Sequence, residues 1–334
     1  MPQRYIFIFT YTTYRTAASV VSYLLSLFLP MSTFIVHTLG CGSAKPTPRH
    51  QASCTVVEHR GNLFMVDCGE GAQLAFMRQK LRLSRLSHIF LTHLHGDHVF
   101  GLPGLIGTLA LSQIGGAITI HTFEEGREIL SNIFDTFSHN RPFDVRFNVI
   151  RPEEAVIYES ASLRVRTVPL RHTLPAVGYI FEEKPALRHL KRDVCDFHGV
   201  PVYMFNRIKA GEDFVRPDGT VIPNHLLTSP PSPPLSYAHI SDTAYILDLA
   251  PRIGPVDLLF HETTYLSDHT ADALVRGHST AAQAATVARD AGARRLLTGH
   301  YSSRYEDDEA FGREASAIFP NVIVGREGLR TPLD

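Results

Sequence analysis

The chain has 334 residues, of which 44% are hydrophobic and 19% charged, and this composition excludes an intrinsically disordered protein. The formal net charge of −1 excludes a global basic field, so any site for a polyanion has to be local. The four cysteines show no close pairing, which is typical of reduced core thiols and not of a disulfide framework: Cys41, Cys54, Cys68 and Cys195. We therefore expect a folded, cytoplasmic protein of one or two domains.

The first thirty residues differ in composition from the rest of the chain. They contain no acidic residue, and the stretch at 17–29 is dominated by apolar residues but is too short for a confident membrane span. No small-residue cleavage motif follows it, as a secretory signal would require. Met31 leads directly into a predicted strand at 34–39, which favours a domain over 31–334. The extension at 1–30 is then either signal-like or an artefact of the start site, and we expect no membrane partner.

The first elements of this domain are predicted from hydrophobic alternation and from turn residues. Two strands and a helix come first, at residues 53–58, 62–66 and 72–79. Asp67, at the end of the second strand, is well placed to hold a ligand ring by a hydrogen bond. A basic group follows the helix and is interpreted as a solvated face: Lys80, Arg82 and Arg85. An apolar run at 86–91 then predicts a buried strand.

Three histidines and one aspartate lie within six residues directly after this strand: His93, His95, Asp97 and His98. Imidazole and carboxylate groups suit Zn²⁺, and catalytic zinc keeps one coordination position open for water. Side chains two residues apart on an extended segment point to the same side, and Gly96 allows a turn that would aim the last two toward a second metal. A chance cluster in a chain with 18 histidines is the alternative, but these ligand types at this spacing favour a metal site.

The elements after the cluster add another histidine to the predicted site. A buried helix, a strand and an amphipathic helix follow, at residues 99–114, 118–121 and 124–137. His139 comes directly after the last helix, on a loop from which a ligand can be aimed inward. Four strands are predicted next, of which the third is closed by Leu170-Arg171-His172, at residues 145–150, 155–158, 163–169 and 178–183.

Residues 184–227 lack the long apolar periodicity of a core element, and we expect them to form a projecting insertion. Two short helical pieces, at about 186–196 and 202–209, lead into a hairpin at 211–223. From residue 184 through residue 223 the insertion carries seven Lys or Arg against five Asp or Glu, so its excess positive charge is only two. Four prolines between residues 228 and 235 mark the return linker.

A β/α alternation restarts after the insertion. Three strands come next, at residues 237–240, 256–260 and 295–298. Each strand is followed by a polar residue that is a candidate for the site: Asp242, Glu262 or His300. His278 precedes an alanine-rich helix, and further elements complete the chain, at 281–290, 306–319 and 322–324. Helices between strands that end in polar side chains predict two layered sheets flanked by helices, with the ligands at one edge.

Seven side chains are thus candidates for metal ligands: His93, His95, Asp97, His98, His139, Asp242 and His300. This number exceeds the needs of one tetrahedral zinc but suits a pair of metals that share one carboxylate. Two ions about 3.5–4 Å apart clamp the attacking and the leaving oxygen and lower the pKa of a bridging water. The expected chemistry is therefore hydrolysis of a phosphodiester or of an acyl bond.

The span from about Ile35 to Asp334 resembles the metallo-β-lactamase superfamily, whose mark is the sequence His-x-His-x-Asp-His. Within it the chain is similar to the ribonuclease Z family through a more specific set of segments: Asp67-Cys68-Gly69-Glu70, Phe100-Gly101-Leu102-Pro103-Gly104, Pro169-Leu170-Arg171-His172, Ser241-Asp242-Thr243, His261-Glu262-Thr263, His278-Ser279-Thr280 and His300-Tyr301-Ser302-Ser303-Arg304-Tyr305. The resemblance implies the α/β fold class, as a metallo-β-lactamase αββα sandwich with a projecting arm. It also implies a zinc-dependent endoribonuclease that removes 3′ trailers from precursor tRNA, leaving a 3′-hydroxyl tRNA and a 5′-phosphorylated trailer.

The resemblance further assigns roles to the candidate residues. Two groups of residues would each hold one Zn²⁺ in every subunit, with Asp242 as the bridge: His93, His95 and His139 in the first group, and Asp97, His98 and His300 in the second. Asp97 would act as the general base in the implied mechanism. For the leaving 3′ oxygen, His278, oriented by Glu262, is our candidate proton donor, because a neutral-range imidazole suits this task; the alternative is a histidine at the start of a helix that only packs. The arm at 184–227 would bind precursor tRNA, and in a homodimer the arm of one subunit would present the tRNA to the site of the other.

Two other functions share parts of this pattern. A dinuclear-zinc hydrolase of a small ester, thioester or lactam would have the same ligands, but the projecting arm and the segment 302–305 favour RNA as the substrate. A catalytically silent RNA-binding relative would have lost ligands, whereas all seven candidates are present. The arm departs from the family at Gly199-Val200-Pro201, where the family often has Gly-Pro, which weakens any assignment of individual contacts in it.

Overall fold

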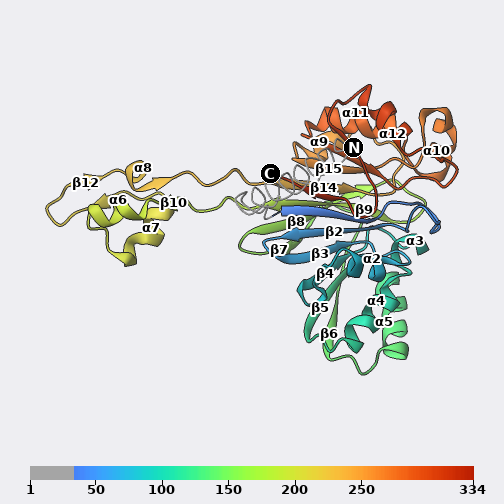
Figure 1. The fold of residues 1–334 in the computed structure, drawn as a ribbon, viewed down its shortest axis with the longest axis horizontal. Helices are drawn as coiled ribbons and strands as arrows, with labels where there is room; N and C mark the ends of the chain where they lie inside the picture. The colour runs from blue at the N-terminus through green and yellow to red at the C-terminus, as the bar shows by residue number, and fades with distance from the viewer. Residues whose placement is uncertain (1–33) are drawn as a thin grey trace, which may run out of the picture. The chain divides into compact units, whose positions relative to one another are not determined.

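The computed structural model describes residues 34–334, and these residues form two seven-stranded β-sheets with helices on their outer faces (Figure 1). The predicted extension at 1–30 lies outside the described residues. The first sheet has the strand order β18-β1-β2-β3-β4-β5-β6. Its strands are β1 (Phe34–Gly40), β2 (Cys54–His59), β3 (Asn62–Val66), β4 (Leu86–Phe90), β5 (Gly116–Thr122), β6 (Phe143–Val149) and β18 (Arg330–Pro332).

The second sheet has the strand order β17-β16-β15-β14-β9-β8-β7. It combines antiparallel hairpins at one side with four parallel strands at the other, β14 to β17. The bounds of its strands are β7 (Val156–Glu159), β8 (Leu163–Leu170), β9 (Ala176–Glu183), β14 (Ser236–Ile240), β15 (Leu258–Glu262), β16 (Leu296–Gly299) and β17 (Val322–Val324). Because parallel strands end at the same edge, the polar residues that follow β14, β15 and β16 come together there.

Helices cover the outer face of each sheet. The first sheet carries α2 (Ala72–Arg78), α3 (Gly96–Val99), α4 (Leu102–Leu111) and α5 (Glu124–Phe137). The second sheet carries α9 (Leu249–Ile253), α10 (Thr270–Arg276), α11 (Ala281–Ala291) and α12 (Glu309–Ser316), and short 3₁₀ turns lie at η1 (Leu83–Arg85) and η3 (Ser267–His269). Within residues 34–334, none of the helices has the length and apolar character needed to cross a bilayer.

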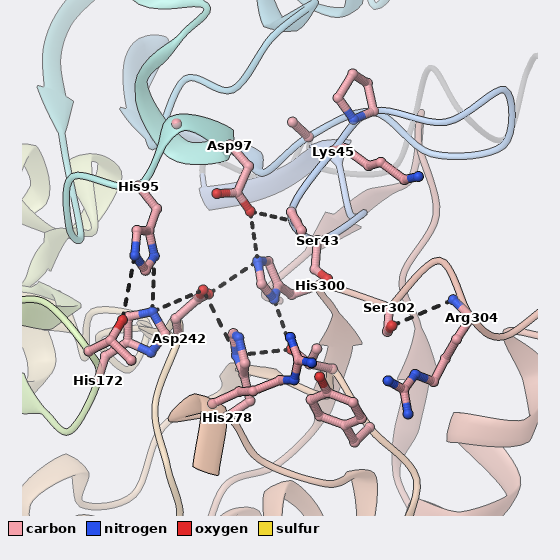
Figure 2. Close-up of a pocket in the computed structure, with 18 of the residues that line it drawn as sticks. Ser43, Lys45, His95, Asp97, His172, Asp242, His278, His300, Ser302 and Arg304 are labelled. Carbon is pink, nitrogen blue, oxygen red and sulfur yellow. Dashed lines mark hydrogen bonds and ion pairs between the residues drawn. The ribbon is translucent and has the colours of Figure 1, made fainter. Parts of the chain in front are cut away.

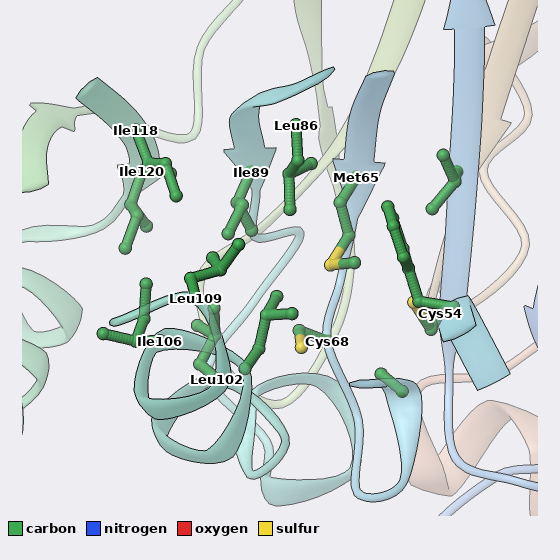
Figure 3. Close-up of a cluster of buried hydrophobic side chains, with 14 of the residues drawn as sticks. Cys54, Met65, Cys68, Leu86, Ile89, Leu102, Ile106, Leu109, Ile118 and Ile120 are labelled. Atoms are coloured by element: carbon green, nitrogen blue, oxygen red, sulfur yellow. The ribbon is translucent and has the colours of Figure 1, made fainter. Parts of the chain in front are cut away.

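Three hydrophobic cores separate these layers. The core between the first sheet and its helices includes Met65, Ile89 and Leu102 (Figure 3). The core between the two sheets is rich in aromatic residues such as Phe90 and Phe181, and a third core under α11 contains many alanines. Alternate residues of one strand face different layers, which follows from the two-residue period of a strand. The layers are therefore helix, sheet, sheet and helix, and the predicted metallo-β-lactamase αββα sandwich is confirmed.

The segment between β9 and β14 forms a small unit with a core of its own. It contains β10 (His189–Leu190), α6 (Arg192–Phe197), η2 (Val202–Met204), α7 (Phe205–Lys209), β11 (Phe214–Val215), β12 (Val221–Ile222), α8 (Asn224–Leu227) and β13 (Thr228–Ser229). Its buried cluster includes Cys195, Ile208 and Leu227, and its apolar members all come from residues 190–227. The side chain of Asn224 ties this core together by donating to the backbone oxygens of residues 208 and 212. We call this segment, residues 184–235, the arm; it comprises the insertion predicted at 184–227 and the return linker predicted at 228–235.

Local differences from the predicted elements have local causes. The helix predicted at 99–114 is α4, which begins only at Leu102, because α3 ends at Val99 and the N–H of Gly101 then donates to the carbonyl oxygen of Cys68. A β-carbon on Gly101 would lie 2.1 Å from the carbonyl oxygen of Gly69, so this close approach requires glycine. The short helices α9 and α10 were not predicted, since segments of five to seven residues carry little periodic signal.

Candidate metal centre

A pocket of about 790 Å³ lies where loops from both sheets meet (Figure 2). Its lining comes from the segments that follow β1, β4, β8, β14, β15 and β16. The strands β1, β14, β15 and β16 are buried along nearly all of their length and are followed by polar residues, so the fold delivers polar side chains to one edge. Basic loop residues also line the pocket, including Lys45 and Arg304.

The loop after β4 supplies the first two donors, His93 and His95. Nε2 of His93 lies 3.0 Å from Nδ1 of His95. The hydroxyl of Thr92 lies 3.1 Å from Nδ1 of His93, which occupies that nitrogen and leaves Nε2 for the cavity. Thr92 is held in turn by the carboxylate of Asp67, to which it donates its backbone N–H at 2.8 Å and its hydroxyl at 2.8 Å. Asp67 thus fixes the loop that carries both histidines.

The third nitrogen of this group comes from His172, in the turn between β8 and β9. Nε2 of His172 lies 3.1 Å from Nδ1 of His95 (Figure 2). Nδ1 of His172 donates to the carbonyl oxygen of Gly277 at 2.8 Å, which fixes the tautomer with a free Nε2. Together with Asp242, the three histidines place one donor atom each within 4.8 Å of one another.

The structure corrects the prediction that His139 belongs to this group. His139 is exposed in the turn between α5 and β6, where it lines a separate shallow pocket with Arg141, Asp144 and Arg146. Since β5 and β6 are parallel, α5 has to carry the chain back from the carboxyl ends of the strands to their amino ends. Its 14 residues span about 21 Å, so the residue after the helix lies at the edge opposite the site.

A second donor group consists of Asp97, His98 and His300. Oδ2 of Asp97 lies 3.5 Å from Nε2 of both histidines, and the two Nε2 atoms are 3.3 Å apart. The other ring nitrogen of each histidine is occupied, because Nδ1 of His98 lies 2.7 Å from Asp67 and Nδ1 of His300 lies 2.9 Å from the hydroxyl of Thr264. His300 has φ +61, a left-handed conformation that turns its ring into the pocket directly after β16.

Asp242 lies between the two donor groups and faces both. Its Oδ2 is 3.6 Å from Nε2 of His93 and 3.8 Å from Nε2 of His172. Its Oδ1 is 3.5 Å from Nε2 of His98 and 3.2 Å from Nε2 of His300. One carboxylate oxygen thus points to each group, which is the arrangement expected of a carboxylate shared by two metal ions.

A buried carboxylate and a half-buried histidine lie beside this centre. Oε1 of Glu262 is 3.1 Å from Nδ1 of His278. Glu262 also accepts hydrogen bonds from the backbone N–H groups of Thr243, Thr264 and Ser279, so a fully buried charge is well compensated. Burial alone would lower the pKa of His278, but the charge and hydrogen bond of Glu262 outweigh it and raise the pKa to about 9.

Comparison with known proteins assigns the chain to a family. Residues 47–184 match the metallo-beta-lactamase superfamily, and residues 232–301 match a beta-lactamase superfamily domain. A ribonuclease Z of Bacteroides fragilis is 47% identical over 300 residues, which cover 90% of this chain and 99% of the relative. A ribonuclease Z of Parabacteroides distasonis is 46% identical over 301 residues, with the same two coverages. The chain belongs to the ribonuclease Z family.

Solved structures agree on the fold of this ribonuclease Z family member. The crystal structure of human tRNase Z, short form, superposes with a TM-score of 0.64 at 24% identity and covers 90% of this chain and 99% of that chain. A long form RNase Z from yeast superposes with a TM-score of 0.59 at 16% identity, over 90% of this chain and 42% of that chain. Membership in this family, together with the two donor groups, identifies the pocket as a metal-binding site.

The electrostatics of the centre fit bound cations. Burial alone would raise the pKa of Asp242, but the surrounding histidines hold it well below its usual value, so the carboxylate is ionised. Burial and the nearby ring of His98 lower the pKa of His93, which favours the neutral imidazole that a metal requires. A buried carboxylate and imidazoles that each direct one ring nitrogen into the pocket are the donor set that suits Zn²⁺.

Several supporting residues were not predicted from sequence. Gly277 acts only through its backbone oxygen, and Ala44 only through its N–H, which donates to Oδ2 of Asp97 at 2.7 Å. Backbone groups carry no residue-specific signal in a sequence. Thr264 and Thr92 are ordinary strand-end threonines, and only their position next to a histidine gives them a role. His172 could have been found from the sequence, because it ends the segment that closes the strand predicted at 163–169, and the other site residues also follow strands.

Proposed function

We propose that this protein is a zinc-dependent endoribonuclease that removes 3′ trailers from precursor tRNA. The products are a tRNA with a 3′ hydroxyl and a trailer with a 5′ phosphate. The observation that carries the proposal is the pair of donor groups joined by Asp242, in a chain whose ribonuclease Z relatives align over nearly their whole length. Such a centre suits attack on a phosphodiester, which needs charge neutralised on both sides of the phosphorus.

Two Zn²⁺ ions per subunit would be held by seven side chains. The first ion would be held by His93, His95 and His172, the second by Asp97, His98 and His300, and Asp242 would bridge them. When bound, such ions supply a water of lowered pKa and neutralise charge on the phosphate. The distances between donor atoms within each group support this assignment, as do the partners that occupy the outer ring nitrogens of His98, His172 and His300.

Asp97 is the proposed general base. The backbone N–H of Ala44 donates to Oδ2 of Asp97 and holds the carboxylate at the mouth of the pocket, while Oδ1 has no such partner among the described residues. Burial would raise the pKa of Asp97, but the hydrogen bond from His300 and the charge of His98 hold it below its usual value. The group is therefore ionised at neutral pH and able to accept a proton.

His278 is the proposed general acid for the leaving 3′ oxygen. Its Nδ1 faces Glu262 at 3.1 Å, so Nε2 carries the proton that the pocket can receive. Glu262 is a positioning residue in this scheme, because it orients the ring and stabilises its charged form. Nδ1 of His278 also lies 3.9 Å from Oδ2 of Asp242, which supports a role next to the metal centre.

The arm is the proposed site for gripping precursor tRNA, in a homodimer where each arm serves the other subunit. A core of its own allows it to act as a unit separate from the sheets. Phe197 and Tyr203 are 82% and 79% exposed on it, and exposed aromatic rings can stack on bases or riboses. We place the enzyme in the cytoplasm, in agreement with four cysteines that are all free and buried.

The decisive experiment incubates the purified protein with a 3′-extended tRNA and maps the cut. A single cut at the trailer junction with a 3′-hydroxyl tRNA product supports the proposal. Hydrolysis of small esters, thioesters or lactams without cleavage of RNA would instead favour the other hydrolase. Subunit exchange tests the dimer: an Asp97→Ala subunit and an arm-deleted subunit, each inactive alone, should together regain activity.

A further inference from the structure

A second pocket lies on the first sheet, away from the metal centre. Its volume is about 450 Å³, and its floor is formed by residues of β1, β2 and β3, with His37 and Leu63 buried in it. Four exposed cationic side chains surround this floor: Lys80, Arg82, Arg85 and Arg330. The first three were interpreted from the sequence as a solvated face. The structure instead gathers them, with Arg330 from the far end of the chain, around one hollow.

Within the part of the chain that the structure describes, these four cations have no carboxylate at ion-pair distance. Among residues 34–334, none of their side chains forms an ion pair, although 33 acidic residues are available in the chain. The one carboxylate that lines the pocket, Glu58, lies 3.1 Å from Nε2 of His37 and faces that ring. Residues 1–33 contain no Asp or Glu, so that segment cannot neutralise the pocket. Four cations against one engaged carboxylate leave a local excess of positive charge in a chain of net charge −1.

Lys80 takes a defined backbone conformation, and the side chain of Arg85 lies close to a turn. Lys80 follows α2 in a left-handed conformation, with φ +56, at the position after a helix where glycine is usual. The last carbonyls of α2 already accept the N–H groups of Lys80 and Leu81, so the cations are not needed to cap the helix. The guanidinium of Arg85 lies across the turn at Gly61, where a β-carbon would lie 2.9 Å from Nη1.

We propose that this basic pocket binds a backbone phosphate of the precursor RNA, which extends the grip on the substrate beyond the arm. The inference rests on the proposed function, because it assigns a second contact to the same substrate. Unpaired cations around a hollow recognise a phosphate through charge and hydrogen bonds. The chain as a whole has no basic field, but the positive charge concentrated in this pocket would provide a local site for a polyanion.

The position of the pocket fits this role. α2 joins the two sites, because Glu70 before the helix lines the metal centre and Gln79 after it lines the basic pocket. Seven helical residues span about 10 Å. Along β1, His37 lies three residues, or about 10 Å, from Gly40, after which the chain enters the metal centre. A strand cut at the metal centre can therefore reach the pocket within about three or four phosphates.

The test removes two of the cations without disturbing the fold. Lys80→Gly removes one charge and also relieves the left-handed backbone, so lost binding cannot be blamed on strain. We combine it with Arg82→Gln and compare it with a control of equal charge loss, Arg78→Gln with Arg151→Gln. Arg78 is exposed on α2 but does not line the pocket, and Arg151 is an exposed arginine elsewhere. Both proteins are tested as full chains with matched melting temperatures.

The pocket variant should bind 3′-extended tRNA about tenfold more weakly than the parent at roughly 0.1 M salt, since each lost phosphate contact lowers the salt slope by about 0.7 to 0.9. Its KM should rise while kcat at saturating tRNA stays parental, and the control should keep the parental affinity and slope. Equal affinity and equal salt slope for the pocket variant and the control would overturn the inference. So would a pocket variant that loses binding of inorganic phosphate alone and keeps its affinity for RNA. If the parent itself fails to cleave the tRNA, the proposed function fails instead, which separates the two.

Discussion

The structure places His172 in the metal centre, where the sequence had predicted His139, and two single substitutions test this assignment directly. His172→Ala removes one of the four donor atoms that lie within 4.8 Å of one another, whereas His139→Ala removes an exposed imidazole from a turn at the other edge of the first sheet. Both variants lose one histidine and keep the net charge. Only the first should affect the metal centre.

The expected magnitude follows from what His172 does in the structure. Its Nε2 lies 3.1 Å from Nδ1 of His95 and 3.8 Å from Asp242, and its Nδ1 is fixed by Gly277. Loss of a residue that merely orients a ligand costs about 10- to 100-fold in metal affinity, so loss of the ligand itself should cost at least ~100-fold, or about 3 kcal/mol. The first group would keep two histidines and a shared carboxylate, which leaves its ion weakly held.

The assay measures metal content and cleavage on the same preparations. Zinc per subunit is determined after dialysis and by competition with a chelating dye, and cleavage is followed on a 3′-extended tRNA. We expect about one tightly held ion per subunit and little cleavage for His172→Ala, and two ions with parental cleavage for His139→Ala. Two tightly held ions and full activity in His172→Ala, or lost zinc in His139→Ala, would refute the assignment of the first group.

Three further predictions concern the reaction and the stability of the fold. Asp97→Ala should abolish cleavage while the affinity for tRNA, measured by filter binding, stays close to parental; cleavage at the parental rate would remove Asp97 as the base. His278→Ala should lower kcat by about 10²- to 10⁴-fold with little change in KM, and an unchanged kcat would argue for a purely structural histidine. His88 and His121 form a partly buried contact of 3.0 Å, and burial lowers their pKa to about 4 and about 3. The unfolded chain takes up these protons near pH 6.5, whereas the folded chain takes them up only at lower pH. The contribution of the two neutral rings to the free energy of unfolding is therefore fully present above about pH 6.5 and is lost as the pH falls. The lowered pKa of His88 alone should make the free energy of unfolding about 2 kcal/mol smaller at about pH 5 than at about pH 7.5. Urea denaturation at the two pH values measures this difference, and equal free energies of unfolding would contradict the prediction.

Much of the fold and of the metal centre could be predicted from the sequence, because the patterns that indicate them lie within short stretches of the chain. The apolar run at 86–91 is followed directly by the donors at 93–98. A two-residue spacing on an extended segment is enough to bring His93 and His95 to one side. Asp242 and His300 were found for a similar reason, since each follows a buried strand. The contact of Glu262 with His278, expected from the sequence, is present at 3.1 Å.

The choice between His139 and His172 could be made only by the tertiary structure. Both histidines follow a predicted element and stand on a loop, so their local sequences make them equal candidates. What separates them is the route of the chain: a crossover helix between parallel strands returns His139 to the far edge, while the hairpin of β8 and β9 turns at the near edge and delivers His172.

The sequence by itself determined which residue types could hold metals and which segments would form strands, because these depend on side-chain chemistry and on short-range periodicity. The tertiary structure alone decided which donors share an ion, which backbone groups orient them, and that Arg330 joins Lys80, Arg82 and Arg85 around one pocket. The physical reason is that coordination and electrostatics depend on distances of a few ångströms between residues that lie up to 250 positions apart. Sheet pairing and crossover connections set those distances, and no local stretch of sequence encodes them.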